Sequence, residues 1–148
     1  MLFRSGVFAA TLWPQAGVWS PPYAGDGTKA YAYAFAAFRM FRNYDGAGGR
    51  FGETGLKAST NNVEATSIYA SRDSLGNLVL IAINKTSAAR PARIAITGAT
   101  GLRTAHVYTL TSALPKPFRQ PDLDLSAAPA ALTYSMPAMS VSTIVLMK

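Results

Sequence analysis

The sequence predicts a mainly β protein, in which an antiparallel β-sandwich follows one strand–helix unit. Three observations predict this class. GVFAATL (6–12) is apolar without alternation, and KAYAYAFAAFRMFRN (29–43) has apolar residues at helical spacing. From residue 54 onward, short segments alternate with a period of two and are separated by turn residues about every 8–12 positions. We therefore expect two parts, a strand–loop–helix element over residues 1–52 and a β-sandwich domain over residues 53–148.

The opening strand, residues 7–12, shows no in–out alternation, which is typical of a strand buried on both faces of a parallel sheet. Pro14 ends it. Residues 15–27 then read as a loop because they contain Pro21-Pro22 and several glycines.

The helix over residues 29–43 is expected to begin after Asp26 or Thr28, either of which can cap it. An alanine-rich stripe permits close approach to a sheet, and an aromatic stripe needs a second partner. The alanine-rich stripe is Ala30, Ala34, Ala37 and Phe41; the aromatic stripe is Tyr31, Phe35, Phe38 and Arg42. Because one strand–helix unit cannot bury its own apolar surface, we predict self-association through Tyr31, Phe35, Phe38 and residues 7–12.

The sandwich strands are expected at residues 63–71, 78–84, 92–97, 104–110, 131–134 and 141–147, with a weaker candidate at 54–59. Asp73 to Asn77 forms a hairpin turn, and Glu64 is expected to face solvent from a strand. The proline-rich stretch 112–129 reads as a long connection.

Composition excludes several classes of site. The chain has 148 residues, 49% of them hydrophobic and 14% charged, as expected for a folded domain, and no cysteine, which excludes thiolate chemistry. Its one histidine, His106, reads as a strand residue with a satisfied hydrogen bond. We expect no cofactor and no metal, because Asp122, Asp124, Asn61 and Asn62 lack the spacing of a calcium loop.

The net charge of +7 raises the question of anionic partners. The basic residues are scattered, and the closest group is Arg39, Arg42 and Arg50 near the helix end, so we expect no nucleic-acid partner. No apolar run is long enough to cross a membrane, and the N-terminus lacks a small-residue cleavage site. We therefore expect neither a membrane span nor a signal peptide in this chain.

Five segments carry a family resemblance: AATLWP, AFRMFRNYDG, RFGETG, SIYASRD and LVLIAINK. Over residues 6–148 the chain resembles the C-terminal portion of glycoside hydrolase family 44, endo-acting β-1,4-glucanases with a (β/α)8 barrel and a β-sandwich built from both chain ends. The resemblance implies that residues 7–12 are the eighth barrel strand and residues 29–43 the eighth barrel helix. It also implies an extracellular parent enzyme acting on cellulose-type β-glucan.

The same resemblance bears on catalysis. It implies two catalytic glutamates on earlier barrel strands, whereas this chain has only Glu53 and Glu64, neither at a catalytic position. The implied role is a non-catalytic module or truncated product with weak glucan contact. Trp13 resembles in position a residue that stacks on sugars, because it follows the eighth strand, where barrel active sites are built.

Two alternatives stay open. A self-sufficient glycoside hydrolase would need two carboxyl groups, for which Asp45 with Glu53 and Asp122 with Asp124 are the candidates. A carbohydrate-binding β-sandwich would use Trp13, Trp19 and Tyr23 as an aromatic platform for glucan, or bind polyanions.

Overall fold

The computed structural model describes residues 29–128 and 130–148. The strand expected at residues 7–12, the caps Asp26 and Thr28, and the aromatic residues Trp13, Trp19 and Tyr23 lie outside the described residues.

The described part of the chain contains one helix and nine strands. The helix α1 is Lys29–Arg42. The strands are β1 (Thr54–Leu56), β2 (Thr66–Arg72), β3 (Leu78–Asn84), β4 (Arg90–Ala95), β5 (Thr104–Thr111), β6 (Leu114–Arg119), β7 (Leu123–Asp124), β8 (Ala131–Met136) and β9 (Ser140–Met147).

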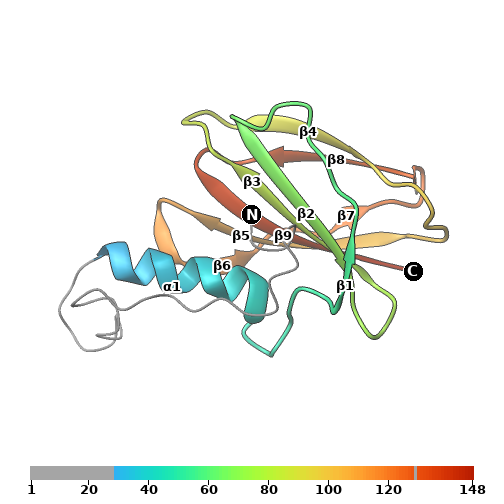
Figure 1. The fold of residues 1–148 in the computed structure, drawn as a ribbon, viewed down its shortest axis with the longest axis horizontal. Helices are drawn as coiled ribbons and strands as arrows, with labels where there is room; N and C mark the ends of the chain where they lie inside the picture. Colours follow the sequence, from blue (N-terminus) through green and yellow to red (C-terminus); the bar gives the residue numbers. More distant parts are fainter. Residues whose placement is uncertain (1–28, 129) are drawn as a thin grey trace.

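The strands form two antiparallel sheets of unequal size. The large sheet has the order β1-β2-β3-β9-β5-β6, with β7 also paired to β5, and the small sheet is β4-β8. Figure 1 shows the small sheet on one side of the large sheet and α1 on the other. The predicted mainly β class and the antiparallel sandwich are therefore confirmed.

The sandwich core lies between β8 and the central strands of the large sheet. Leu80, Val107, Leu132 and Ile144 meet there, nearly or fully buried. The strand LVLIAIN (78–84) is apolar on both faces because the small sheet covers one face and the helix side covers the other. The predicted bounds of this strand are confirmed.

The helix packs on the opposite face of the large sheet. Ala36 and Met40 are fully buried against Leu110, and Ala37 and Phe41 are partly buried beside them. The prediction that small residues allow α1 to approach a sheet is thus confirmed at Ala37, although Ala36 and Met40, the most buried of the described side chains of α1, lie outside the predicted stripe.

Two members of the predicted aromatic stripe of α1, Phe35 and Phe38, face away from the sheet. Phe35 is 43% exposed and Phe38 is 51% exposed, whereas the side chain of Tyr31 lies outside the described set. This part of the helix presents apolar surface to the exterior of the described fold.

Two strand predictions need correction. The strand expected from residue 63 begins at Thr66, because Asn62 closes a turn in which it accepts hydrogen bonds from the amides of Ala65 and Thr66. Glu64 is therefore an exposed turn residue and not a strand residue.

The stretch predicted as a long connection, 112–129, contains the strands β6 and β7. Pro115 and Pro117 favour the prediction of a loop over the residues of β6, because proline lacks the amide hydrogen that a strand donates. At the end of the sheet this absence is tolerated, since an edge strand pairs on one side only. In the described residues, no helix is long and apolar enough to cross a membrane.

Candidate functional site

The candidate site is a hollow beside one end of the large sheet, called here the Tyr44 hollow. It has a volume of about 380 Å³ and is lined by side chains of the link between α1 and β1 (44–53), the β2–β3 turn (73–77), β5 and β9. Asp45 and Glu53, one of the predicted carboxyl pairs, both line it. The structure thus brings this pair to one surface.

Asp45 shapes the link. Its Oδ1 atom accepts hydrogen bonds from the backbone amides of Ala47 and Gly49, both at 2.8 Å. Gly48 has a φ of 97°, a conformation that glycine adopts without steric cost. One carboxylate oxygen of Asp45 is therefore committed to folding the link.

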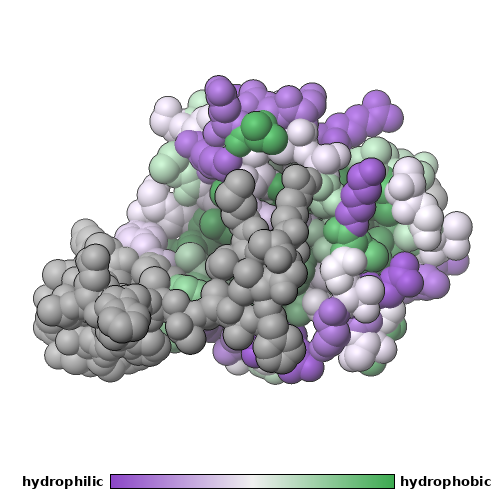
Figure 2. All heavy atoms as spheres, in the orientation of Figure 1, coloured by the Kyte–Doolittle hydropathy of each residue, from purple (hydrophilic) through white to green (hydrophobic). Residues whose placement is uncertain are grey.

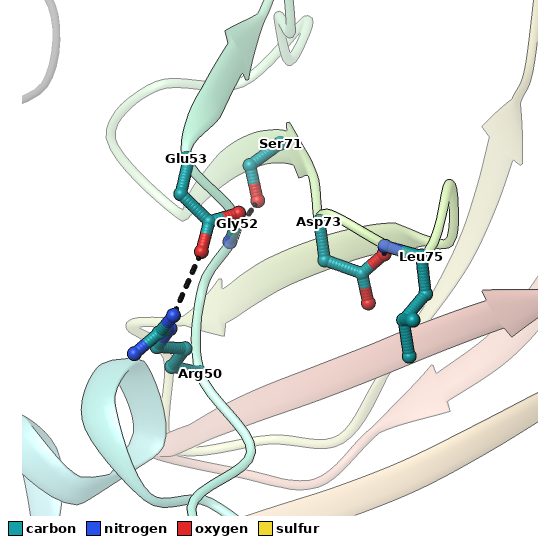
Figure 3. A network of polar contacts seen from close by, with 6 residues as sticks. All are labelled: Arg50, Gly52, Glu53, Ser71, Asp73 and Leu75. Carbon is teal, nitrogen blue, oxygen red and sulfur yellow. Dashed lines mark hydrogen bonds and ion pairs between the residues drawn. The ribbon is translucent and has the colours of Figure 1, made fainter.

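Glu53 lies in an ion pair with Arg50. The Arg50 Nη2 and Glu53 Oε1 atoms are 3.0 Å apart, and about half of each side chain is exposed. Figure 3 shows this pair beside the backbone contact of Gly52 with Ser71. A catalytic acid usually lies in a buried, apolar pocket, whereas the Glu53 side chain is about half exposed and paired with a cation.

Asp73 forms the opposite wall of the Tyr44 hollow and stabilises the predicted hairpin turn. Its carboxylate accepts hydrogen bonds from the backbone amides of Leu75 and Asn77 and from the Asn77 side chain, at 2.8–3.0 Å. Figure 3 shows the carboxylate turned toward the Leu75 amide. The prediction of Asp73 as a turn residue is confirmed.

Glycine is required where the link meets its neighbours. A Cβ atom on Gly49 would lie 2.6 Å from Asp45 Oδ2 and 2.7 Å from the Tyr44 ring. A Cβ atom on Gly52 would lie 2.2 Å from the Arg72 carbonyl oxygen. The close approach of the link to β2 and to Tyr44 therefore depends on these two glycines.

Two tyrosines form an aromatic pair at the Tyr44 hollow. The ring centroids of Tyr44 and Tyr108 are 5.0 Å apart, and the rings are inclined by 46°. Burial, followed by the nearby charges of Asp45 and the other acidic and phenolic groups, raises the pKa of Tyr44 to about 12. The Tyr44 phenol therefore stays protonated at physiological pH.

The second predicted pair, Asp122 and Asp124, is divided between different partners. Asp122 accepts two hydrogen bonds from Arg119 at 2.7 and 2.9 Å, and its Oδ2 atom lies 3.4 Å from His106 Nε2. Asp124 accepts a hydrogen bond from the Ser126 amide at 2.8 Å, and this contact lowers its pKa. Each carboxylate has a local structural partner.

His106 lies on β5, as predicted, and also lines the Tyr44 hollow. Its partner is the Asp122 carboxylate. Among residues 29–128 and 130–148, no three histidine, aspartate or glutamate side chains come together in a way that could hold a metal ion.

Sequence reasoning missed Tyr44, Asp73 and His106 as neighbours of Asp45 and Glu53. From the sequence alone, Tyr44 is expected at the end of a helix, Asp73 in a turn and His106 in a strand. Their meeting depends on long-range packing of the link on β5 and β9, for which one sequence carries no local signal.

A second concave surface, called here the sandwich groove, lies at the open side of the sandwich. It has a volume of about 990 Å³ and is lined by residues of β2, β3 and β4 and by the segment 56–62. Its floor includes Ile68, Leu80 and Ile94, all on strands of the sandwich. Figure 2 shows hydrophilic side chains along the rim of the molecule near β4 and the segment that leads into β2.

No protein-family model matches the chain. One curated relative is "Endoglucanase A" of Paenibacillus lautus, 36% identical over 84 residues, a match that covers 55% of this chain and 10% of the relative. The relative is bacterial, and its name describes an endoglucanase.

Solved structures give a broader match. Cel44A, a family 44 endoglucanase from Clostridium thermocellum, matches with a TM-score of 0.75 and 26% identity over 80% of this chain and 24% of that chain. The chain resembles the C-terminal portion of family 44 glycoside hydrolases. A Paenibacillus polymyxa xyloglucanase of this family, solved with xyloglucan, matches with a TM-score of 0.74 and 26% identity over 80% of this chain and 24% of that chain.

CelM2, a bifunctional glucanase-xylanase from a metagenome library, is 32% identical, with a TM-score of 0.72 over 77% of this chain and 22% of that chain. The chain therefore spans about a quarter or less of these proteins. Their polysaccharide substrates include xyloglucan, and the resemblance predicted from the five sequence segments is confirmed.

Proposed function

We propose that this chain is a non-catalytic C-terminal module of a β-1,4-glucan-degrading enzyme, which braces the catalytic barrel. The sandwich groove carries this proposal. The large sheet has seven strands, whereas β4 and β8 alone form the second sheet in the described residues. Ile68 and Ile94 in this groove are only partly buried by the described residues, and such apolar surface suits further strands of the same enzyme, in line with a sandwich built from both chain ends.

The exposed side of α1 supports the same proposal. In the resemblance, α1 is the eighth barrel helix, which has one side on the sandwich and another on its barrel neighbours. Phe38 is half exposed, and Phe35 is nearly so, on the side away from the sheet. Apolar aromatic surface of this kind is typical of an interface. In the absence of the barrel, the same side, with Tyr31 and residues 7–12, would support self-association.

The polysaccharide in this proposal is a β-glucan of the cellulose or xyloglucan type, and the parent enzyme is extracellular. Trp13, Trp19 and Tyr23 would supply an aromatic platform for weak contact with it. The boundary between the barrel-derived element, 1–52, and the sandwich, 53–148, belongs to the same proposal.

The test is complementation of a shortened relative. Cel44A of Clostridium thermocellum would be expressed without the portion that matches this chain, and this chain would then be added. We expect the two pieces to co-elute and to recover endoglucanase activity, measured on carboxymethyl cellulose. Phe38→Ser is expected to weaken recovery. Val63→Ser is the matched control, because it also replaces an exposed apolar side chain with serine but lies in a turn away from α1. It is expected to leave recovery unchanged.

The rival function is hydrolysis by this chain alone. A reducing-sugar assay on carboxymethyl cellulose would compare the chain with its Asp45→Asn, Glu53→Gln, Asp122→Asn and Asp124→Asn variants. We expect no turnover in any of them, because the described carboxylates have structural partners. Turnover that disappears in one folded variant would overturn the non-catalytic proposal.

A further inference from the structure

The Tyr44 hydroxyl is the unusual group in the Tyr44 hollow. The Tyr44 side chain is only 8% exposed, and its hydroxyl makes no hydrogen bond with the described residues. In the described part of the chain, no fully buried side-chain oxygen lacks a partner, so this hydroxyl is not sealed off. It remains accessible beside the hollow that Tyr44 lines, and it stays protonated.

Two carboxylate oxygens at the same surface are also available. Asp45 uses Oδ1 and Glu53 uses Oε1 in their internal bonds, while Asp45 Oδ2 and Glu53 Oε2 accept no hydrogen bond from the described residues. Carboxylate oxygens held in place in this way accept strong hydrogen bonds from neutral hydroxyl groups. Tyr44, Asp45 and Glu53 therefore offer one donor and two acceptors to a ligand.

The remaining lining selects the charge of the ligand. Three carboxylates, Asp45, Glu53 and Asp73, face the Tyr44 hollow together with one permanent cation, Arg50. This balance disfavours an anion. Val145 and Met147 add apolar surface next to the tyrosine pair, as required for the C–H faces of a sugar ring. A neutral, hydroxyl-rich ligand with apolar ring faces fits both properties.

We propose that the Tyr44 hollow binds a sugar unit of a neutral β-glucan. The volume of about 380 Å³ falls within the range of about 300–1,000 Å³ that small-molecule pockets occupy. The identity of the sugar rests on the proposed function, because it takes β-glucan as the polymer that the parent enzyme meets. The site itself rests on the arrangement of Tyr44, Asp45 and Glu53.

The test is a titration of the full ¹⁵N-labelled chain with cellotetraose, followed by NMR. We expect the largest amide shifts in the link and in the β2–β3 turn, at Gly48, Gly49 and Asn77. Tyr44→Phe removes only the hydroxyl and is expected to weaken binding about 3- to 10-fold, the effect of one hydrogen bond. Tyr33→Phe is the matched control. The Tyr33 hydroxyl donates a hydrogen bond to the Ser112 carbonyl, outside the lining of the Tyr44 hollow, so this variant is expected to bind cellotetraose normally.

A second variant covers the case in which Tyr44→Phe does not fold. Ser74→Trp places a large side chain at an exposed turn position on the rim, without a change in the core, and is expected to abolish the shifts. Binding that both variants leave unchanged, shifts confined to other surfaces, or no binding at millimolar cellotetraose would each overturn the site. If complementation of the shortened relative still succeeded, only this site would fail, and the bracing function would stand.

Discussion

The hydroxyl of Thr143, at the centre of the large sheet, donates a 2.7 Å hydrogen bond to the backbone carbonyl of Met40. The last carbonyls of a helix lack partners within the helix. Three carbonyls at the end of α1 accept hydrogen bonds. The Arg39 carbonyl accepts one from the Asn43 amide, the Met40 carbonyl from the Thr143 hydroxyl, and the Phe41 carbonyl from the Phe51 amide. The end of α1 is thus joined to β9 and to the link that forms the Tyr44 hollow.

Thr143→Val should lower the free energy of unfolding by about 1–3 kcal/mol, because it keeps the shape but leaves the buried Met40 carbonyl without its donor. Chemical denaturation of the full chain measures this change. Thr133→Val, at an exposed position of β8, is the control and should change the free energy little. Equal effects at the two positions would show that the contact with Met40 does not stabilise the fold.

Gly52→Ala should destabilise the chain by about 1–3 kcal/mol or more, since the new methyl group would overlap the Arg72 backbone and displace the link from β2. Thermal unfolding compares it with Gly55→Ala, where a Cβ atom meets no heavy atom within 4 Å. A Gly52→Ala protein as stable as Gly55→Ala would contradict the close approach of the link to β2.

Tyr134→Phe should cost about 1–3 kcal/mol of unfolding free energy. The Tyr134 hydroxyl lies 3.2 Å from Thr109 Oγ1 and 3.0 Å from Ser142 Oγ inside the sandwich, and its removal leaves both hydroxyls without this partner. Tyr33→Phe, which removes an exposed hydrogen bond, should cost less. Denaturant midpoints of the two variants, measured side by side, decide the comparison.

The stability of the chain should fall as the pH rises from about 10 to about 12. The fold raises the pKa of Tyr44 from 10.0 to about 12, so it favours the protonated phenol. This contribution is complete below pH 10, the unfolded value, and disappears as the pH passes through the folded value. In Tyr44→Phe the decline in unfolding free energy over this range should be smaller, and an unchanged slope would exclude Tyr44 as its source.

Local patterns predicted most of the fold. The run LVLIAIN, the hairpin turn at Asp73 and the helix over residues 29–43 carry strong periodicity or turn chemistry, and the structure has them within about one residue. The strand β6 was missed because Pro115 and Pro117 suit an edge strand, whose position depends on its neighbours and not on its own residues.

The candidate site could be predicted only in part. Asp45 and Glu53 are close in the sequence, and the sequence could predict that both lie on one surface of the Gly-rich link. Tyr44 and Asp73 join them because the link and the β2–β3 turn pack at the same end of the sheet. That meeting depends on the register of β2 with β3 and on the packing of Tyr44 against β5, which are tertiary properties.

The place of β9 has a consequence for biosynthesis. It is the last strand in the described sequence, yet it lies between β3 and β5 and pairs with both along its length. The two halves of the large sheet therefore cannot join until residue 147 has left the ribosome. The sandwich assembles only after its whole length has been translated, so a chain exported during synthesis would cross the membrane before this sheet exists.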